Sequence, residues 1–131
     1  EKIKTALAPY EKAQKVKVFS DKSLALDGIE FKPSFGHTPG HYSFKLKSDG
    51  QEAVFIGDIV HSHTLQFDKP ETAIEFDIDP QTAIQTRLKH FAEYAKEGQL
   101  IAAPHLPFPG LGHIYSQDGK SYQWIPVHFK D

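Results

Sequence analysis

The segment from Asp79 to Gly98 constrains the fold more than any other part of this sequence, because it has the start, the period and the end of an α-helix. Asp79 can cap the first backbone N–H groups, and Pro80 suits the first turn. Gly98 is typical of the residue that ends a helix. The apolar positions between them form one stripe, at Ile84, Leu88, Phe91 and Ala95. His90 falls off this stripe, so we expect it to face solvent.

Short apolar or alternating segments elsewhere predict β-strands. Residues 53–56 and 100–103 are apolar runs that fit buried strands. Asp27-Gly28 suits the tight turn of a β-hairpin. Further strands are expected at residues 16–19, 24–26, 29–35, 42–47, 114–116 and 122–129.

The N-terminal residues 2–14 have helical spacing, and Pro9 is expected to kink or end that helix. A short helix, several strands, a long helix and further strands therefore follow one another. This order predicts a mixed α/β (α+β) fold, a sheet with helices on it, in one domain.

The composition excludes several functions. The formal net charge is -2, which provides no basic surface for nucleic acid. No apolar run approaches the roughly 18 residues that a membrane span needs. The chain has no cysteine, so disulfides, thiolate ligands and a cysteine nucleophile are all excluded. Its 8 histidines are many for 131 residues, and nitrogen and oxygen atoms would have to hold any metal.

Three polar residues follow apolar strands and form a candidate metal site. His37 lies in the turn Gly-His-Thr-Pro-Gly-His at residues 36–41, Asp58 follows the strand at 53–56, and His105 follows the strand at 100–103. Loops at strand ends often converge, and one carboxylate with two imidazoles suits Zn²⁺ or Mn²⁺. Each residue also has an interpretation without a metal. His37 and His105 could be solvated loop histidines, and Asp58 could be a turn carboxylate.

Two other histidines are expected to support this site. We expect His41 to pack or hydrogen-bond beside it, and His113 to brace the loop that begins at His105. His61 follows Asp58 closely enough to reach the same pocket.

The motifs GHTPGH at 36–41, FIGD at 55–58 and AAPHLPFPGLGH at 102–113 together resemble the second half of metallo-β-lactamase-fold hydrolases. The stretches GDIVH at 57–61, QFD at 66–68 and Asp79-Pro80 look like the branch that contains methyl parathion hydrolase and related lactonases and aryl esterases. The resemblance extends from about Val16 to the C-terminus. It implies that residues 1–131 are the C-terminal half of one αββα sandwich domain.

The resemblance also implies a site for two divalent metal ions, zinc by default, with manganese, iron and cobalt compatible. His37 would bind the first metal, Asp58 would bridge both, and His105 would bind the second. A hydroxide held between the metals would attack the substrate, so no side chain would be the nucleophile. Lactones and aryl esters are the expected substrates, followed by phosphotriesters. β-Lactams and thioesters fit less well, because the loop at 102–110 does not look like those branches.

The family's HxHxDH motif is absent from the sequence. His61-Ser62-His63 is the only HxH, and no Asp-His follows it. We therefore expect the chain to need a partner, the N-terminal half that supplies this motif, and to bind metal poorly and be inactive alone. The alternative is a non-catalytic scaffold remnant or interaction module, and a second chain with HxHxDH would argue against it.

A half-sandwich leaves one face of its sheet uncovered, so we expect this chain alone to aggregate or dimerise. Full-length relatives are often homodimers. Relatives also often have export signals, which would place the complete protein in the periplasm or outside the cell.

The matching branch places three positions beside the substrate, and here they are His61, Ile74 and Phe76. An apolar wall of this kind suits a flat ester or lactone. The other interpretation is that Ile74 and Phe76 are core residues, since large apolar side chains are usually buried for packing.

Overall fold

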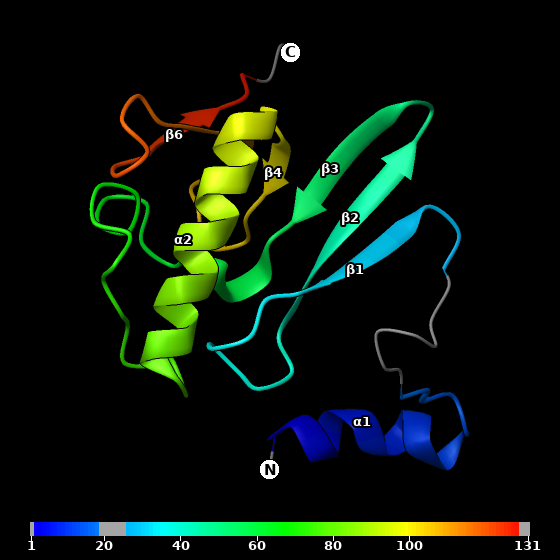
Figure 1. Ribbon diagram of the computed structural model, residues 1–131. Helices are drawn as coiled ribbons and strands as arrows, with labels where there is room; N and C mark the ends of the chain where they lie inside the picture. Colours follow the sequence, from blue (N-terminus) through cyan, green and yellow to red (C-terminus); the bar gives the residue numbers. More distant parts are fainter. Residues whose placement is uncertain (1, 19–25, 129–131) are drawn as a thin grey trace.

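A six-stranded mixed sheet with one long helix across one face forms the body of the computed structural model, which describes residues 2–18 and 26–128 (Figure 1). The elements in chain order are α1 (Lys2–Lys12), β1 (Ile29–Pro33), β2 (Tyr42–Ser48), β3 (Gln51–Phe55), the 3-10 turn η1 (Gly57–Ile59), α2 (Pro80–Glu97), β4 (Leu100–Ala102), β5 (Leu111–Tyr115) and β6 (Gln123–Pro126). The predicted mixed α/β fold is confirmed.

The strands follow one another in the sheet in chain order, from β1 to β6. β3 and β4 pair in parallel, because the chain crosses back along α2 between them, and all other neighbours are antiparallel. The carboxyl ends of β3 and β4 therefore lie at the same edge of the sheet. This edge places the residues after β3 beside those after β4.

The predicted signals at both ends of α2 are confirmed. The Asp79 side chain accepts hydrogen bonds from the backbone N–H and the hydroxyl of Thr82, at 3.0 and 2.7 Å. At the other end, Gly98 adopts φ +62° and its N–H bonds to the carbonyl oxygen of Tyr94. Such a left-handed residue ends the helix without the steric cost that a side chain would add.

The buried face of α2 is rotated from the predicted stripe, and the prediction that His90 faces solvent is wrong. His90 is 2% exposed, and its Nδ1 lies 2.6 Å from the hydroxyl of Tyr94, whereas Leu88 is 38% exposed. Polar residues can occupy the buried face because they have partners there. The buried residues of the helix are Ala83, Arg87, His90, Phe91 and Tyr94.

The hydrophobic core lies between α2 and the sheet. Val54, Ile101 and Ile114 are its sheet residues, from the neighbouring strands β3, β4 and β5. Phe91 of α2 stacks on Phe67, with ring centroids 4.9 Å apart. This packing fixes the helix against the two parallel strands whose ends form the candidate site.

The N-terminal segment differs from its prediction. α1 continues through Pro9 to Lys12, and residues 15–18 have no regular structure, so the predicted strand at 16–19 is wrong for its described part. Phe19 and the predicted strand residues 24–25 lie outside the described residues, and Leu26 pairs with Ile29 only as an isolated bridge. Every described side chain from residue 3 to residue 18 is exposed.

The other strand boundaries differ by a few residues. β3 begins at Gln51, and β5 begins at Leu111, inside the loop predicted from the Pro and Gly residues. β6 ends at Pro126, before the end predicted for it. No helix in the described parts of the chain is both long enough and apolar enough to cross a membrane.

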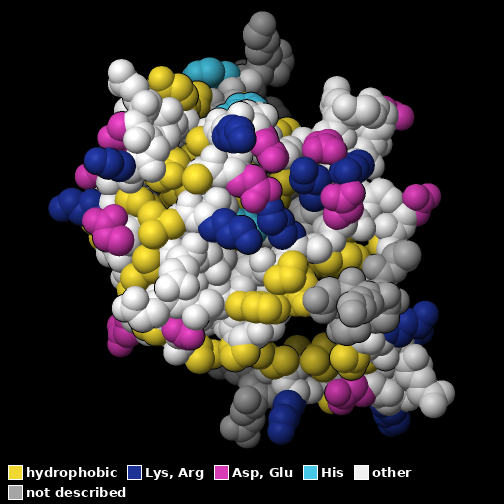
Figure 2. Space-filling view, viewed as in Figure 1, with side chains coloured by type: hydrophobic (Ala, Val, Ile, Leu, Met, Phe, Trp, Pro, Cys, Tyr) yellow, Lys and Arg dark blue, Asp and Glu magenta, His cyan; other side chains and the backbone are white. Residues whose placement is uncertain are grey.

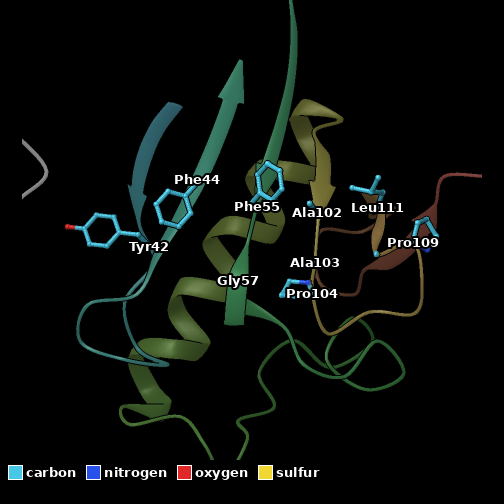
Figure 3. Close-up of a pocket in the computed structure, with 10 residues that line it drawn as sticks. Tyr42, Phe44, Phe55, Gly57, Ala102, Ala103, Pro104, Pro109 and Leu111 are labelled. Atoms are coloured by element: carbon cyan, nitrogen blue, oxygen red, sulfur yellow. The ribbon is translucent and has the colours of Figure 1, made fainter. Parts of the chain in front are cut away.

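The face of the sheet opposite α2 is apolar, and no described part of the chain forms a second layer on it. Cross-strand pairing aligns one row of side chains on it, Phe31, Phe44, Phe55, Ala102 and Leu111, and we call this row the open face. Phe44 and Phe55 are among the exposed large hydrophobic residues. Figure 3 shows Phe44 beside Phe55, with Ala102 between Phe55 and Leu111.

The α2 side of the β2–β3 hairpin is charged instead. Lys47 forms ion pairs with Glu30 at 2.6 Å and with Glu52 at 3.3 Å, and Lys45 pairs with Glu52 at 3.2 Å. Figure 2 shows the basic and acidic side chains mixed on this side of the molecule. The charged, solvated surface of the hairpin is therefore on the α2 side, and the apolar side chains of the hairpin are on the open face.

Candidate metal centre

Asp58 lies at the centre of the candidate site, where the chain turns sharply at the end of β3. Gly57 adopts φ +54°, a left-handed conformation that disfavours any side chain. A Cβ at this position would also lie only 2.7 Å from Nε2 of His41. Two features therefore require glycine at position 57: the left-handed turn and the close approach of the His41 ring.

Imidazole nitrogens surround the Asp58 carboxylate. The Oδ1 atom lies 2.6 Å from Nε2 of His105 and 3.4 Å from Nε2 of His61. The Oδ2 atom lies 3.8 Å from Nε2 of His37. The structure thus brings together the three residues predicted as metal ligands, and it adds His61 to them.

The rings of these histidines also contact one another. His61 stacks on His105 with centroids 4.4 Å apart, and His37 lies 5.0 Å from His61. The three rings therefore form one nitrogen-rich wall beside the carboxylate.

His41 has a different role from His37, although both lie in the same turn. Its Nε2 accepts the backbone N–H of Asp58 at 2.9 Å, and its Nδ1 lies 3.0 Å from the carbonyl oxygen of Ser34. An imidazole that accepts at Nε2 and donates from Nδ1 is neutral. Burial lowers the pKa of His41, which agrees with this state. The expectation that His41 hydrogen-bonds beside the site is confirmed.

The electrostatics of the cluster favour an ionised Asp58 carboxylate and a neutral His61 ring. Burial alone would raise the pKa of Asp58, but the hydrogen bond from His105 and the charges of His37 and His105 outweigh it, and the pKa is lowered. Burial and then the charge of His105 lower the pKa of His61. This is the protonation state that metal ligands need.

The donor set fits divalent metal ions. One ligand atom from each of His37, Asp58 and His61 lies within 4.8 Å of the other two. His61 also has a buried Nδ1 with no hydrogen-bond partner among the described residues, and an imidazole usually satisfies both nitrogens. Nitrogen and carboxylate ligands of this kind suit zinc, and also manganese, iron and cobalt.

His113 lies away from this cluster, and the expectation that it braces the His105 loop is wrong. Its Nδ1 is 3.1 Å from the carbonyl oxygens of Gly98 and Gln99, at the start of β4. β5 runs antiparallel to β4, so each residue along β5 lies farther from the carboxyl end of β4, where His105 follows. His113 therefore supports the junction between α2 and β4.

The other two predicted pocket residues lie on the segment before α2. Ile74 is half-buried, and its N–H donates to Asp77 Oδ2 at 3.2 Å. Phe76 is 73% exposed, which contradicts the interpretation of this residue as part of the core. Asp77, which the sequence did not single out, lies 3.1 Å from Nδ1 of His37.

An open cavity of about 500 Å³ adjoins the cluster on the open face (Figure 3). Gly57 and Pro104, which directly precede Asp58 and His105, form one part of its wall. Aromatic and aliphatic side chains form the rest, among them Tyr42, Phe44, Phe55 and Leu111. His61, Ile74 and Phe76 are not among its lining residues, so this cavity is not bounded by the predicted substrate wall.

Solved structures of the β-lactamase superfamily superimpose on this chain. The hydrolase AbOPH of that superfamily matches with a TM-score of 0.95 and 63% identity, over 99% of this chain and 44% of that one. AidC, a dizinc quorum-quenching lactonase, matches with a TM-score of 0.85 and 27% identity, over 97% of this chain and 44% of that one. Neither the protein-family models nor the curated proteins include a match.

A third structure extends the likeness in fold. A probable metal-dependent hydrolase from Staphylococcus aureus matches with a TM-score of 0.63 and 20% identity, over 91% of this chain and 42% of that one. The chain therefore has the fold of the β-lactamase superfamily, as its motifs indicated. It spans less than half the length of each of these three solved chains.

Proposed function

We propose that this chain is the C-terminal half of a metal-dependent hydrolase with a binuclear metal site. The observation that supports this most directly is the arrangement at Asp58, whose two oxygens face His105 and His61 on one side and His37 on the other. A carboxylate with imidazoles on both sides is suited to bridging two cations. The high identity to a β-lactamase-superfamily hydrolase supports the same class of reaction.

In this proposal each ligand side chain has one role. Asp58 would hold both metals, His37 would hold the first, and His105 would hold the second. The metals would supply the Lewis acidity that activates water for hydrolysis and would stabilise developing negative charge. His41 holds the backbone of Asp58, and His61, which stacks on His105, would face the substrate.

The proposed partner is the N-terminal half that supplies the HxHxDH motif. The open face supports this part of the proposal, because a row of large apolar side chains in register over five strands is the surface that a second sheet would cover. The 44% coverage of the two more similar solved chains is consistent with a missing half of similar size.

We further propose lactones and aryl esters as substrates, with phosphotriesters as weaker ones. The likeness to AidC, a lactonase, supports the lactone class. Ile74 and Phe76, on the segment before α2, would provide an apolar wall for a flat ester or ring. The alternative is a scaffold remnant without catalytic activity, which the absence of HxHxDH would favour only if no other segment or chain supplies that motif.

Joining this chain to its complementary half and assaying hydrolysis tests the proposal. A lactone, an aryl ester and an aryl phosphotriester are compared before metal removal, after chelation and after zinc is restored. The proposal predicts metal-dependent turnover of the lactone and the ester, with kcat/KM at least about tenfold above that of the phosphotriester. Turnover that survives complete metal removal, or no turnover of any substrate, would contradict it.

A further inference from the structure

Two buried charged side chains, Asp77 and Arg87, lie next to one another, and Asp77 also contacts His37. The side chain of Asp77 is fully buried, and that of Arg87 is 1% exposed. Asp77 Oδ1 lies 3.1 Å from His37 Nδ1, and Asp77 Oδ2 lies 3.9 Å from Arg87 Nη2. Burying a charge costs free energy unless the charge is paired and hydrogen-bonded. A buried ion pair in a small domain is therefore expected to have a specific role.

Arg87 fixes the irregular segment between β3 and α2. Its Nε donates to the carbonyl oxygen of Ile59 at 2.8 Å, and its Nη1 donates to those of Pro70 and Thr72 at 2.9 and 2.8 Å. Ile59 directly follows Asp58. One guanidinium therefore ties the turn that holds Asp58 to the segment that leads to Asp77.

A buried amide extends this framework to His61. The Oε1 of Gln66 accepts the backbone N–H groups of His61 and Ser62 at 2.8 and 3.1 Å, and its Nε2 donates to the carbonyl oxygen of Thr72 at 3.0 Å. Arg87 donates to that same Thr72 carbonyl. Gln66 and Arg87 thus meet at one backbone group, and together they position the chain on both sides of the candidate metal centre.

The contact between Asp77 and His37 determines which ring nitrogen is free. A carboxylate oxygen accepts hydrogen bonds, so the donor inferred for this contact is Nδ1 of His37. When the ring has a single proton, that proton is then on Nδ1, and the lone pair of Nε2 points toward the side of Asp58. The second Asp77 oxygen accepts the N–H of Ile74, which holds the carboxylate in this orientation.

We propose that Asp77 and Arg87 are positioning residues of the metal centre. Asp77 sets the tautomer and the ring orientation of His37, and Arg87 anchors Asp77 together with the segment that follows Asp58. This inference rests on the proposed function, because it assigns His37 Nε2 to the metal. Carboxylate partners of metal-binding histidines typically change metal affinity about 10- to 100-fold.

The first test reads the tautomer directly, by long-range ¹⁵N–¹H NMR of the metal-free protein, this chain with its complementary half, at alkaline pH where imidazoles are neutral. The inference predicts a proton on Nδ1 of His37 in the unaltered protein and a shift toward the Nε2–H form in Asp77→Ala. A proton on Nε2 in the unaltered protein would overturn it, whether or not any variant folds.

The second test measures the zinc dissociation constant by competition with a chelator. Asp77→Ala should raise this constant about 10- to 100-fold, while Glu75→Gln, an exposed carboxyl change two residues away, should leave it within about twofold. Equal constants for Asp77→Ala and the control would overturn the inference. If the unaltered protein binds no zinc, the proposed function fails, and the tautomer result still decides whether Asp77 orients His37.

Discussion

The backbone N–H of Asp58 donates a hydrogen bond to Nε2 of His41 at 2.9 Å. This contact distinguishes the roles of the two histidines in the turn at residues 36–41. The Nε2 of His41 accepts a backbone hydrogen bond, whereas the Nε2 of His37 is directed at the Asp58 carboxylate. The contact with His41 also explains why Gly57 must lack a side chain. The position of Asp58 thus depends on a histidine whose two ring nitrogens both have backbone partners.

Gly57→Ala should disturb the site more than a comparable change elsewhere. Gly57 and Gly119 both adopt left-handed backbone conformations, with φ +54° and +71°. A Cβ at Gly119 meets nothing within 4 Å, whereas one at Gly57 meets the His41 ring. We expect Gly119→Ala to cost about 1 kcal/mol of unfolding free energy from backbone strain alone. Gly57→Ala should cost at least about 1 kcal/mol more and weaken metal binding, and equal losses in chemical denaturation would contradict the proposed contact.

His90 should make the stability depend on pH. Burial, followed by the charge of Lys32, lowers the pKa of His90 to about 4 from its ordinary 6.5; Lys89 acts in the same direction, and Glu93 opposes them. Between these values the unfolded chain binds a proton that the native chain does not. The contribution of His90 to stability is therefore fully present above pH 6.5 and is lost as the pH falls toward 4, with a slope of up to ~1.4 kcal/mol per pH unit.

His90→Asn removes this titration and can still accept from the hydroxyl of Tyr94. As the pH falls from 6.5 toward 4, the unfolding free energy of this variant should change less steeply than that of the unaltered protein. The reason is that unfolding of the variant takes up about one proton fewer. His128→Asn, at an exposed histidine, should keep the original slope. Identical slopes for the two variants would show that His90 does not titrate as its burial implies.

Local signals explain which parts of this fold could be predicted. The caps of α2 and the apolar runs of β3 and β4 depend on neighbours in sequence, and the sequence located them correctly. The burial of His90 depends on the hydroxyl of Tyr94 and on the packing of the whole helix, which no periodicity reveals. His113 was misplaced for a similar reason, because its contacts follow from the antiparallel pairing of β5 with β4.

The candidate site also contains residues that local sequence signals predicted and residues that only tertiary contacts reveal. His37, Asp58 and His105 follow strands, and the structure brings them together; their role as metal ligands stays a prediction. The contacts of Asp77, Arg87 and Gln66 were not predicted, although Gln66 lies in the QFD stretch. These contacts are with backbone groups of an irregular segment and, for Asp77, also with His37. A buried Arg in the middle of an amphipathic helix gives no sequence signal that separates it from a surface Arg.

Phe55→Glu should prevent the open face from associating. Phe55 is 47% exposed and lies between Phe44 and Ala102 in the cross-strand row. In sedimentation velocity we expect the unaltered chain alone to self-associate, and Phe55→Glu should shift it toward monomer and prevent assembly with the complementary half. Leu65→Glu, at a 43% exposed residue outside the sheet, should behave as the unaltered chain does. A monodisperse unaltered monomer would contradict this use of the open face.

Phe76→Ala tests the proposed substrate wall. Because Phe76 is largely exposed, the substitution should change the unfolding free energy by no more than about 0.5 kcal/mol. The assembled enzyme should show a KM for aryl esters raised severalfold with little change in kcat, as expected when binding alone is lost. Leu65→Ala is the matched control, and an unchanged KM for Phe76→Ala would remove this residue from the pocket.

The most direct test of the central claim is the metal content of the assembled protein, measured by elemental analysis together with the intact mass of every chain in the sample. If Asp58 bridges two metals, the unaltered protein should contain about two transition metal ions per site, and Asp58→Asn should lose at least one of them. Asp68→Asn, at an exposed aspartate, should retain both. A single metal that Asp58→Asn leaves in place, or no metal with a complete HxHxDH half present, would contradict the account.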